Sequence, residues 1–175
     1  MQIKDKNFKT FISEAELQQI VARLACDISN DFRDSDLIVC PVLTGAFMFA
    51  ADLVRRITVP CEINFVRYSS YSGMSSTGQV KCLLPFRADI EGRDLLIVED
   101  VIDSGLSIQN ILRDAETLRP RSVKVCALFY KPNAFRGNYK IDYVGREIGD
   151  EFIVGYGLDY DEQGRNLPEI LVIDN

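Results

Sequence analysis

Histidine is absent from the 175 residues of this sequence. Its absence excludes Ser-His-Asp and Cys-His catalysis, and it excludes metal sites that depend on imidazole ligands. Any acid–base chemistry must therefore use carboxylates, lysine, tyrosine or cysteine. Any bound metal is expected to be a hard ion held by oxygen ligands.

The sequence also lacks an excess of positive charge. It has 20 Lys and Arg against 26 Asp and Glu, a net charge of −6. Binding to nucleic acid or to an anionic membrane surface depends on a basic face, so neither partner is expected. No apolar run approaches the roughly 20 residues of a membrane span. The first six residues, Met1 to Lys6, lack the apolar core of a signal peptide, so we expect a cytoplasmic protein.

Cysteine pairs at metal-binding or redox spacing are missing as well. The five cysteines are odd in number and widely spaced, and none forms a Cys-x-x-Cys pair. Most lie in apolar runs. We therefore expect buried free thiols in place of disulfides or a zinc site.

The order of the predicted elements indicates an α/β fold in a single domain, residues 1–175. The predicted strands are 36–43, 61–68, 79–86, 95–98, 123–130, 141–144, 152–154 and 170–173. The predicted helices begin at a capping box, Ser13 to Glu16, at Ala46 (ending near Ile57) and at Ile108. This order predicts a twisted, mainly parallel sheet flanked by helices, with a small accessory lobe.

One stretch combines structural and chemical signals. Leu95 to Val98 is a continuous apolar run, typical of a strand that is covered on both faces. Three carboxylates follow it, Glu99, Asp100 and Asp103, before the small polar loop Ser104-Gly105-Leu106-Ser107. The loop and the start of the next helix offer backbone N–H groups and the positive end of the helix dipole, which suit a phosphate.

Carboxylates would repel a phosphate unless the ligand also presents hydroxyls or a metal ion to them. A ribose 5-phosphate satisfies both requirements, with its phosphate on the loop and its 2- and 3-hydroxyls donating to Glu99 and Asp100. The alternative is a strand–turn–helix that Ser104 or Ser107 caps, with the acids simply solvated. Three acids beside a Ser-Gly-x-Ser loop favour the binding site.

Three further segments carry weaker signals. Thr44-Gly45 follows a predicted strand and is a second candidate phosphate site, although glycine after a strand is more often only a turn. The segment 69–78 is either a flexible hairpin tip or a lid, in which Ser70 and Tyr71 supply hydroxyls. Lys131 directly follows a predicted strand, which places its ammonium either at the ligand-binding edge of the sheet or in solvent.

The segment from Val98 to Ser107 closely resembles the phosphoribosyl-diphosphate-binding signature of type I phosphoribosyltransferases, in the form found in the hypoxanthine-guanine enzymes. The likeness runs from about Leu37 to the end of the chain and is most similar to the bacterial members. The further motifs that carry it are 67–71, 131–132, 142–145, 152–160 and 165–168.

The resemblance implies an enzyme that joins a 6-oxopurine, hypoxanthine and also guanine, to 5-phosphoribosyl 1-diphosphate with Mg²⁺ present. On the sugar side, Glu99 and Asp100 would hold the ribose hydroxyls and a metal ion, and Ser104 to Ser107 would bind the 5-phosphate. Asp103 would assist proton transfer at purine N7. The pyrophosphate loop would be Leu43-Thr44-Gly45.

The resemblance also assigns residues near the C-terminus. Arg165 would reach the pyrophosphate, and Asp159 would help to hold a second Mg²⁺. Lys131 would contact the purine 6-oxo group, Phe152 would stack on the ring, and Ile153 would offer backbone groups to its edge. The hood, as the accessory lobe is called in this family, would come from the N- and C-terminal segments.

One departure concerns the pyrophosphate loop, where the family commonly has lysine and this chain has Thr44. The backbone-amide role survives this change, but a charge or a subunit contact made by that lysine does not. The apolar helix predicted from Ala46 and the family's usual assemblies imply a homodimer or homotetramer. The alternatives are a non-catalytic nucleotide- or RNA-sensing regulator, and a phosphoribosyltransferase for xanthine or a pyrimidine.

Overall fold

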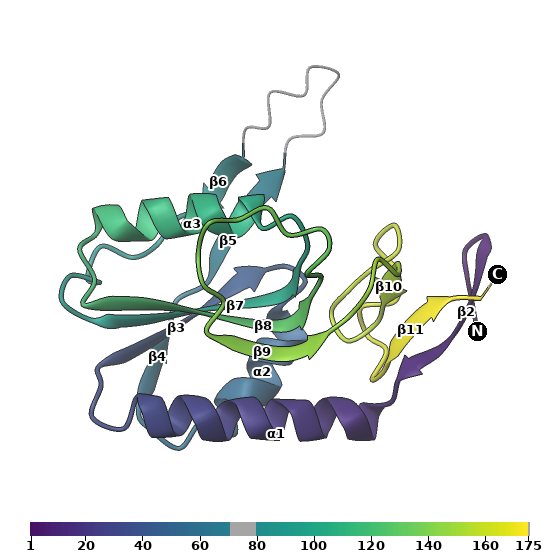
Figure 1. The fold of residues 1–175 in the computed structure, drawn as a ribbon, viewed down its shortest axis with the longest axis horizontal. Coiled ribbons are helices and arrows are strands. Elements are labelled where there is room, and N and C mark those ends of the chain that lie inside the picture. Colours follow the sequence, from purple (N-terminus) through teal and green to yellow (C-terminus); the bar gives the residue numbers. More distant parts are fainter. Residues whose placement is uncertain (71–79, 175) are drawn as a thin grey trace.

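A computed structural model describes residues 1–70 and 80–174. Its main sheet has the strand order β6-β5-β3-β7-β8-β9, with β4 paired to β3, and a smaller sheet has the order β1-β2-β11-β10 (Figure 1). The strands are β1 (Gln2–Ile3), β2 (Lys6–Ile12), β3 (Leu37–Leu43), β4 (Cys61–Ile63), β5 (Val66–Ser70), β6 (Val80–Leu84), β7 (Asp94–Ile102), β8 (Ser122–Tyr130), β9 (Tyr143–Glu147), β10 (Ile153–Val154) and β11 (Ile170–Ile173). The helices among these residues are α1 (Glu14–Asp31), α2 (Phe47–Val54) and α3 (Leu106–Thr117).

The main sheet is mostly parallel. β3 pairs in parallel with β4, β5 and β7, and the parallel series continues through β8 to β9. Among the described strands of this sheet, β5–β6 is the single antiparallel pair. The predicted α/β class with a twisted, mainly parallel sheet is confirmed. The carboxyl ends of the parallel strands point toward the smaller sheet, which forms the hood (Figure 1).

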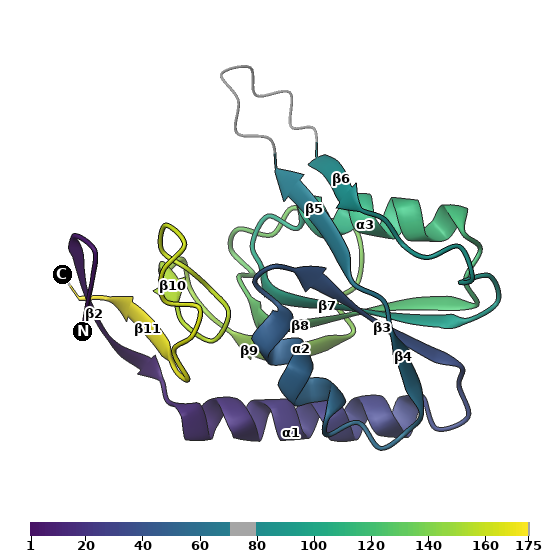
Figure 2. The same ribbon diagram turned by 180° about the vertical axis from the view of Figure 1, so that it is seen from behind.

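Helices cover both faces of the main sheet, as the continuous apolar runs require. Leu96 and Val98 of β7 pack into the cluster that includes the apolar faces of α1 and α2. Leu95 and Ile97 point the other way, into the cluster that includes α3 (Figures 1 and 2). The central strand is therefore rigidly held, and its carboxyl end is a fixed platform for side chains.

The start of α1 matches the predicted capping box. Ser13 Oγ accepts from the Glu16 amide at 3.3 Å, and the Ser13 amide donates to Glu16 Oε2 at 2.9 Å. α2 is shorter than predicted, because Ala46 is its N-cap and the chain leaves the helix after Val54. Its apolar residues are largely explained by burial within the chain, since Phe49 and Leu53 lie in the core.

The hood is built from both ends of the chain, and its amino-terminal strands were not predicted. β2 pairs antiparallel with β11, with Ile12 opposite Ile170 and Phe8 opposite Ile173. Phe8 packs with Val154 in a small cluster of the hood. The strand signal of β2 is weak, because its apolar residues, Phe8, Phe11 and Ile12, do not alternate with polar ones.

Other boundaries differ from the predictions. The predicted strand 61–68 is two strands, since the Asn64 amide donates to the Val39 carbonyl at 2.9 Å between β4 and β5. β7 continues to Ile102, so Glu99 and Asp100 lie in the strand and not after it. All five cysteines are free, but only Cys40 and Cys126 are buried; Cys26 and Cys82 are exposed, so the expectation of buried thiols was partly wrong. Among the described residues, no helix is long and apolar enough to span a membrane.

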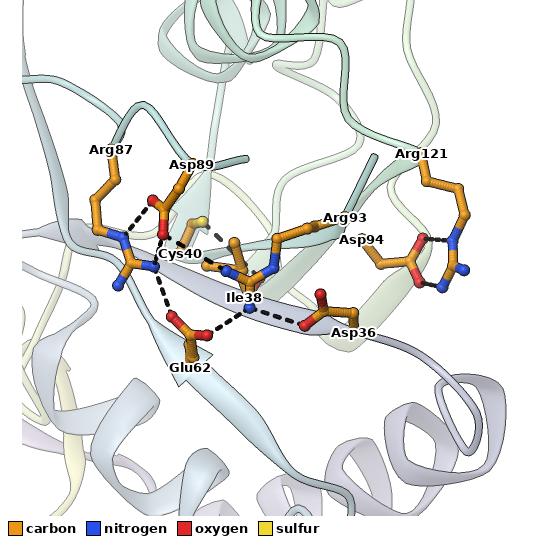
Figure 3. A network of polar contacts seen from close by, with 9 residues as sticks. All are labelled: Asp36, Ile38, Cys40, Glu62, Arg87, Asp89, Arg93, Asp94 and Arg121. Carbon is orange, nitrogen blue, oxygen red and sulfur yellow. Dashed lines mark hydrogen bonds and ion pairs between the residues drawn. The ribbon is translucent and has the colours of Figure 1, made fainter. Parts of the chain in front are cut away.

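An ion-pair network lies at the amino ends of the same strands (Figure 3). Arg93 pairs with Asp36 at 2.8 Å and with Glu62 at 2.7 Å. Beside them, the buried Asp94 carboxylate pairs with Arg121 and accepts from Ser122 Oγ at 2.7 Å. The network joins the segments that precede β3 and β7 to β4 and β8, at the end of the sheet opposite the hood.

Candidate active site

The end of β7 and the start of α3 form a pocket of about 170 Å³. Its lining includes most of the residues that the central motif predicted: Glu99, Asp100, Asp103, Ser104, Gly105 and Ser107. β7 supplies the first two carboxylates directly, because it continues as a strand past Val98. The sequence therefore places three acids and a helix amino terminus around one cavity.

The two strand acids have unlike environments. Glu99 is 8% exposed and accepts from the Asp100 amide at 3.1 Å. Burial, and after it the neighbouring Asp100 charge, raises the pKa of Glu99 well above its usual value. Asp100 Oδ1 accepts from the Val101 amide at 2.7 Å. Such a pair favours a ligand that donates hydrogen bonds or brings positive charge.

The start of α3 is open to an anion. Gly105 is the N-cap, with a φ of 80°, and no described side chain caps the helix, so the alternative of capping by Ser104 or Ser107 is wrong. The backbone N–H groups of the first turn are left available, and Leu106 is exposed. Tyr139 Oη donates to the Gly105 carbonyl at 3.0 Å and holds the loop from behind.

Lys131 lies at the carboxyl edge of the sheet, as predicted, immediately after β8. Its Nζ lies 3.7 Å from Asp103 Oδ2 and donates to the Glu151 carbonyl at 3.0 Å. Its side chain is only 12% exposed, whereas that of Asp103 is 60% exposed. The ammonium is thus held between the acid cluster and the segment before β10, which excludes the alternative of a freely solvated lysine.

The segment beside Lys131 presents an aromatic ring. Phe152 follows Glu151, is 46% exposed, and meets Tyr160 edge to face with ring centroids 5.8 Å apart. Ile153 is buried and pairs with Val172 of β11. An exposed ring that is fixed by a neighbouring tyrosine is suited to stacking against a planar ligand.

A second group of predicted residues lies against the Asp100 carboxylate. The Leu43–Thr44 peptide is cis, and a Cβ atom at Gly45 would overlap the Asp100 carboxylate. A Cβ atom at Gly157 would in turn overlap the Gly45 carbonyl. The loop after β3 is therefore stacked between the central strand and the turn that contains Gly157.

The same turn carries two more predicted residues. Arg165 Nη1 donates to the Gly157 carbonyl at 2.9 Å, and Arg165 Nη2 lies 2.8 Å from Asp159 Oδ1. The structure therefore brings Asp159 and Arg165 together with Gly45. Of the predicted lid residues, Ser70 ends β5, and Tyr71 and the rest of the loop up to residue 79 lie outside the described residues.

A family model described as a phosphoribosyl transferase domain matches residues 13–161. The chain belongs to this family. The phosphoribosyl transferase resemblance that the central motif predicted is confirmed.

Named phosphoribosyltransferases match nearly all of the chain. The hypoxanthine-guanine phosphoribosyltransferase of Mycobacterium tuberculosis is 44% identical over 170 residues, covering 93% of this chain and 84% of its own. The hypoxanthine phosphoribosyltransferase of Escherichia coli is 41% identical over 165 residues, covering 93% of each. A crystal structure of a Bacillus anthracis hypoxanthine-guanine phosphoribosyltransferase superposes with a TM-score of 0.91 at 40% identity, covering 97% of this chain and 100% of that one.

This phosphoribosyl transferase chain also uses site residues that the sequence reasoning missed. A Cβ atom at Gly105 would lie 2.5 Å from the Phe135 ring and 2.7 Å from Tyr139 Oη, so these two aromatics shape the back of the loop at residues 104–107. The Glu151 carbonyl, which accepts from Lys131, is a backbone group and gives no sequence signal. The aromatics could have been suspected, because they lie in the loop directly after Lys131.

Oxygen donors for a metal ion are present, but not as a complete site. Among the residues that the structure describes, no three Asp, Glu, Cys or His side chains are grouped closely enough to hold a metal ion. Glu99 with Asp100, and Asp159 alone, offer separate carboxylates. This donor set fits Mg²⁺, which takes one or two protein carboxylates and completes its shell with water and substrate phosphates.

Proposed function

We propose that this chain is a purine-salvage phosphoribosyltransferase. It joins hypoxanthine, with guanine as a second base, to 5-phosphoribosyl 1-diphosphate, and it releases pyrophosphate and the nucleoside 5′-monophosphate. One observation carries the proposal: the acids of β7 and the open amino terminus of α3 line a single pocket. A sugar phosphate is the ligand that satisfies both.

On the sugar side, Glu99 and Asp100 accept from the ribose hydroxyls, which relieves the unfavourable burial of adjacent carboxylates. The amides and hydroxyls of residues 104–107 bind the 5-phosphate. Binding at both ends of the ribose fixes the anomeric carbon between the purine and the leaving pyrophosphate.

On the purine side, Lys131 donates to the 6-oxo group and Phe152 stacks on the ring, while Ile153 offers backbone groups to its edge. Adenine would present an amino donor to the ammonium, and both donors would lose their partner, a mismatch worth about 1–3 kcal/mol. The anchor of Lys131 on the Glu151 carbonyl supports this role, because it aims the ammonium at one position. Asp103 assists proton transfer at purine N7.

On the pyrophosphate side, the backbone of Leu43-Thr44-Gly45 and the Arg165 guanidinium stabilise the charge that develops as the bond from the anomeric carbon to the pyrophosphate oxygen breaks. Glu99, Asp100 and Asp159 would hold Mg²⁺. When bound there, Mg²⁺ supplies further neutralisation of the leaving group. Because Thr44 stands where the family commonly has lysine, Arg165 is the side chain that would supply positive charge to the leaving pyrophosphate.

The proposal extends to the setting of the enzyme. We place it in the cytoplasm, as a homodimer or homotetramer that acts on small molecules and binds no nucleic acid. The acidic net charge of −6 supports the last point.

A product assay tests the proposed function. The protein is incubated with Mg²⁺, phosphoribosyl diphosphate and one base at a time, drawn from hypoxanthine, guanine, xanthine, adenine and uracil. We expect the monophosphates of hypoxanthine and guanine, and none from adenine. If only xanthine or uracil gave a product, the chain would be a phosphoribosyltransferase for that base. If no base gave a product, a non-catalytic regulator would be favoured.

A further inference from the structure

A hydrogen bond between the buried Tyr156 and the partly buried Asp52 joins α2 to the turn beside the pyrophosphate loop. Tyr156 is 3% exposed, and its Oη donates to Asp52 Oδ2 at 2.5 Å. Asp52 lies on α2, and the same Oδ2 accepts from Gln18 Nε2 of α1 at 2.9 Å. Arg55 also pairs with Asp52. Burial raises the pKa of Asp52, but the hydrogen bonds from Tyr156, Gln18 and Arg55 together lower it by more. The net pKa is below the usual value, so the carboxylate stays ionised as an acceptor.

Tyr156 has an unusual backbone conformation. Its φ is 51°, in the left-handed region that non-glycine residues avoid at a cost of about 1–2 kcal/mol. Its amide donates to the Leu167 carbonyl at 2.9 Å, and the next amide, that of Gly157, donates to the Arg165 carbonyl at 2.9 Å. The turn keeps this geometry because the tyrosine ring is buried and its hydroxyl is bound on α2.

The position of this turn matters for the site. Gly157 has a left-handed φ and lies against the Gly45 carbonyl so closely that only glycine fits, and a Cβ atom at Gly45 would displace the Asp100 carboxylate. Arg165 and Asp159 are bonded to the same turn. A displacement of Tyr156 would therefore move the pyrophosphate loop and its two charged neighbours together.

We propose that Asp52 is a positioning residue of the pyrophosphate side: through Tyr156 it holds the turn that sets Gly45, Asp159 and Arg165 in register with Asp100. This inference rests on the proposed function. Asp52 lies on α2, the helix that follows the Leu43–Gly45 loop. Its side chain therefore links this loop to the turn that contains Gly157. Asp52 and Tyr156 need not touch substrate for this role.

The chain offers a matched control. Tyr143 is also buried, and its Oη donates to Asp31 Oδ2 at 2.6 Å. This pair joins β9 to the end of α1, and neither residue borders the site pocket or the stack. Tyr143→Phe therefore removes the same kind of bond at a place where it can affect stability alone.

The test compares steady-state kinetics of four variants. We expect Tyr156→Phe and Asp52→Ala to raise KM for phosphoribosyl diphosphate about tenfold, the effect of losing one charge-assisted hydrogen bond. KM for hypoxanthine should change less. Asp52→Asn keeps one acceptor oxygen but loses the charge and the second oxygen, so its KM should lie between those of wild type and Asp52→Ala. Tyr143→Phe should lower the melting temperature and leave both KM values unchanged.

Two results would overturn the proposal: KM for phosphoribosyl diphosphate within twofold of wild type in Tyr156→Phe, or an equal rise in Tyr143→Phe. Hydrogen exchange at backbone amides tests this proposal independently of the proposed function, because the measurement needs no enzyme turnover. Exchange at Gly157 should accelerate in Tyr156→Phe and not in Tyr143→Phe. A wild-type protein without activity would refute the proposed function, while exchange would still decide whether the pair holds the turn.

Discussion

Asp103 differs from the two acids before it in its access to solvent. Its side chain is 60% exposed, whereas Glu99 is buried, and it lies 3.7 Å from the Lys131 ammonium. Its carboxylate could therefore reach a purine bound by Lys131. In the proposed function this contrast would let three carboxylates in five residues serve different purposes, with the strand acids binding the sugar and Asp103 assisting proton transfer.

Asp103→Asn should lower turnover about a hundredfold or more, the usual contribution of a general acid or base. Binding of phosphoribosyl diphosphate should change little, because the amide keeps the size of the carboxylate. Single-turnover rates and equilibrium binding would separate the two effects. Turnover equal to that of wild type would refute a proton-transfer role for Asp103.

Lys131→Ala should erode the discrimination between 6-oxo and 6-amino purines by about tenfold to a hundredfold. The ratio of kcat/KM for hypoxanthine and adenine is the measurement. Lys140→Ala is the control, because Lys140 pairs with Asp142 and its side chain is 80% exposed. If adenine remains fully excluded in Lys131→Ala, the ammonium does not decide base choice.

At the scale of elements, the start of α3 has a strict steric requirement. Gly105 combines a left-handed φ with aromatic atoms where a side chain would lie. Gly92 has a similar φ of 75° but no atoms within 4 Å of its missing Cβ. The two glycines therefore separate the cost of backbone conformation from the cost of displacing Phe135 and Tyr139.

Gly92→Ala should cost about 1–2 kcal/mol of unfolding free energy and leave activity intact. Gly105→Ala should cost more and should also raise KM for phosphoribosyl diphosphate severalfold, because the phosphate loop must move away from the aromatics. Denaturant unfolding and steady-state kinetics on both variants provide the check. Equal effects of the two substitutions would argue against a shaped loop.

The central elements were predictable from sequence, because their signals are local. The apolar run of β7, the helical spacing of α3 and the Ser13 capping box each depend on neighbours within a few residues. The extension of β7 through Glu99 was missed, since acids normally end an apolar run and only the pocket accounts for their place in the strand. β2 was missed because its partner, β11, lies at the other end of the chain.

The candidate site was predictable to a similar extent. The acids, the phosphate loop and Lys131 follow directly from strand ends, so topology brings them together. The contacts of Gly157 with Gly45 and of Tyr156 with Asp52 could not be predicted, because each joins segments separated by more than half of the chain. A glycine in a loop indicates a turn but not what that turn will touch.

At the scale of the whole molecule, the two ends of the main sheet have separate tasks. The carboxyl ends carry the site, and the amino ends carry the ion-pair network of Figure 3. Asp94 begins the same strand that ends in the acids of the site, yet its side chain is 5% exposed and bonded only to structural partners. Stability and activity should therefore respond to different substitutions.

Asp94→Asn tests this separation. The Arg121 hydrogen bond is the main cause that lowers the pKa of Asp94 to about 2 from its ordinary 3.8. A lowered folded-state pKa means that the stabilisation is complete above the unfolded pKa and is lost as pH falls towards the folded one. We expect Asp94→Asn to lose about 1–3 kcal/mol at pH 7, and the difference from wild type should shrink between about pH 4 and pH 2.

The measurement is denaturant unfolding across that pH range, together with kcat/KM at neutral pH, which should not change. Asp36→Asn serves as the control, because Asp36 belongs to the same network but its side chain is 64% exposed, so its loss should cost less than about 1 kcal/mol. A pH-independent difference between Asp94→Asn and wild type would contradict the assignment of the stabilisation to the ionised carboxylate.

The stack of Asp100, Gly45 and Gly157 also limits how this enzyme could be re-engineered. Three stretches of chain meet there, and an added methyl group at Gly45 or Gly157 would displace its neighbour, so a change in one stretch affects the others. A loop grafted from another transferase in place of residues 43–45 would have to arrive with its own counterpart of the 155–165 turn. Recombination that cuts between them would yield chimaeras that fold but hold their leaving group poorly.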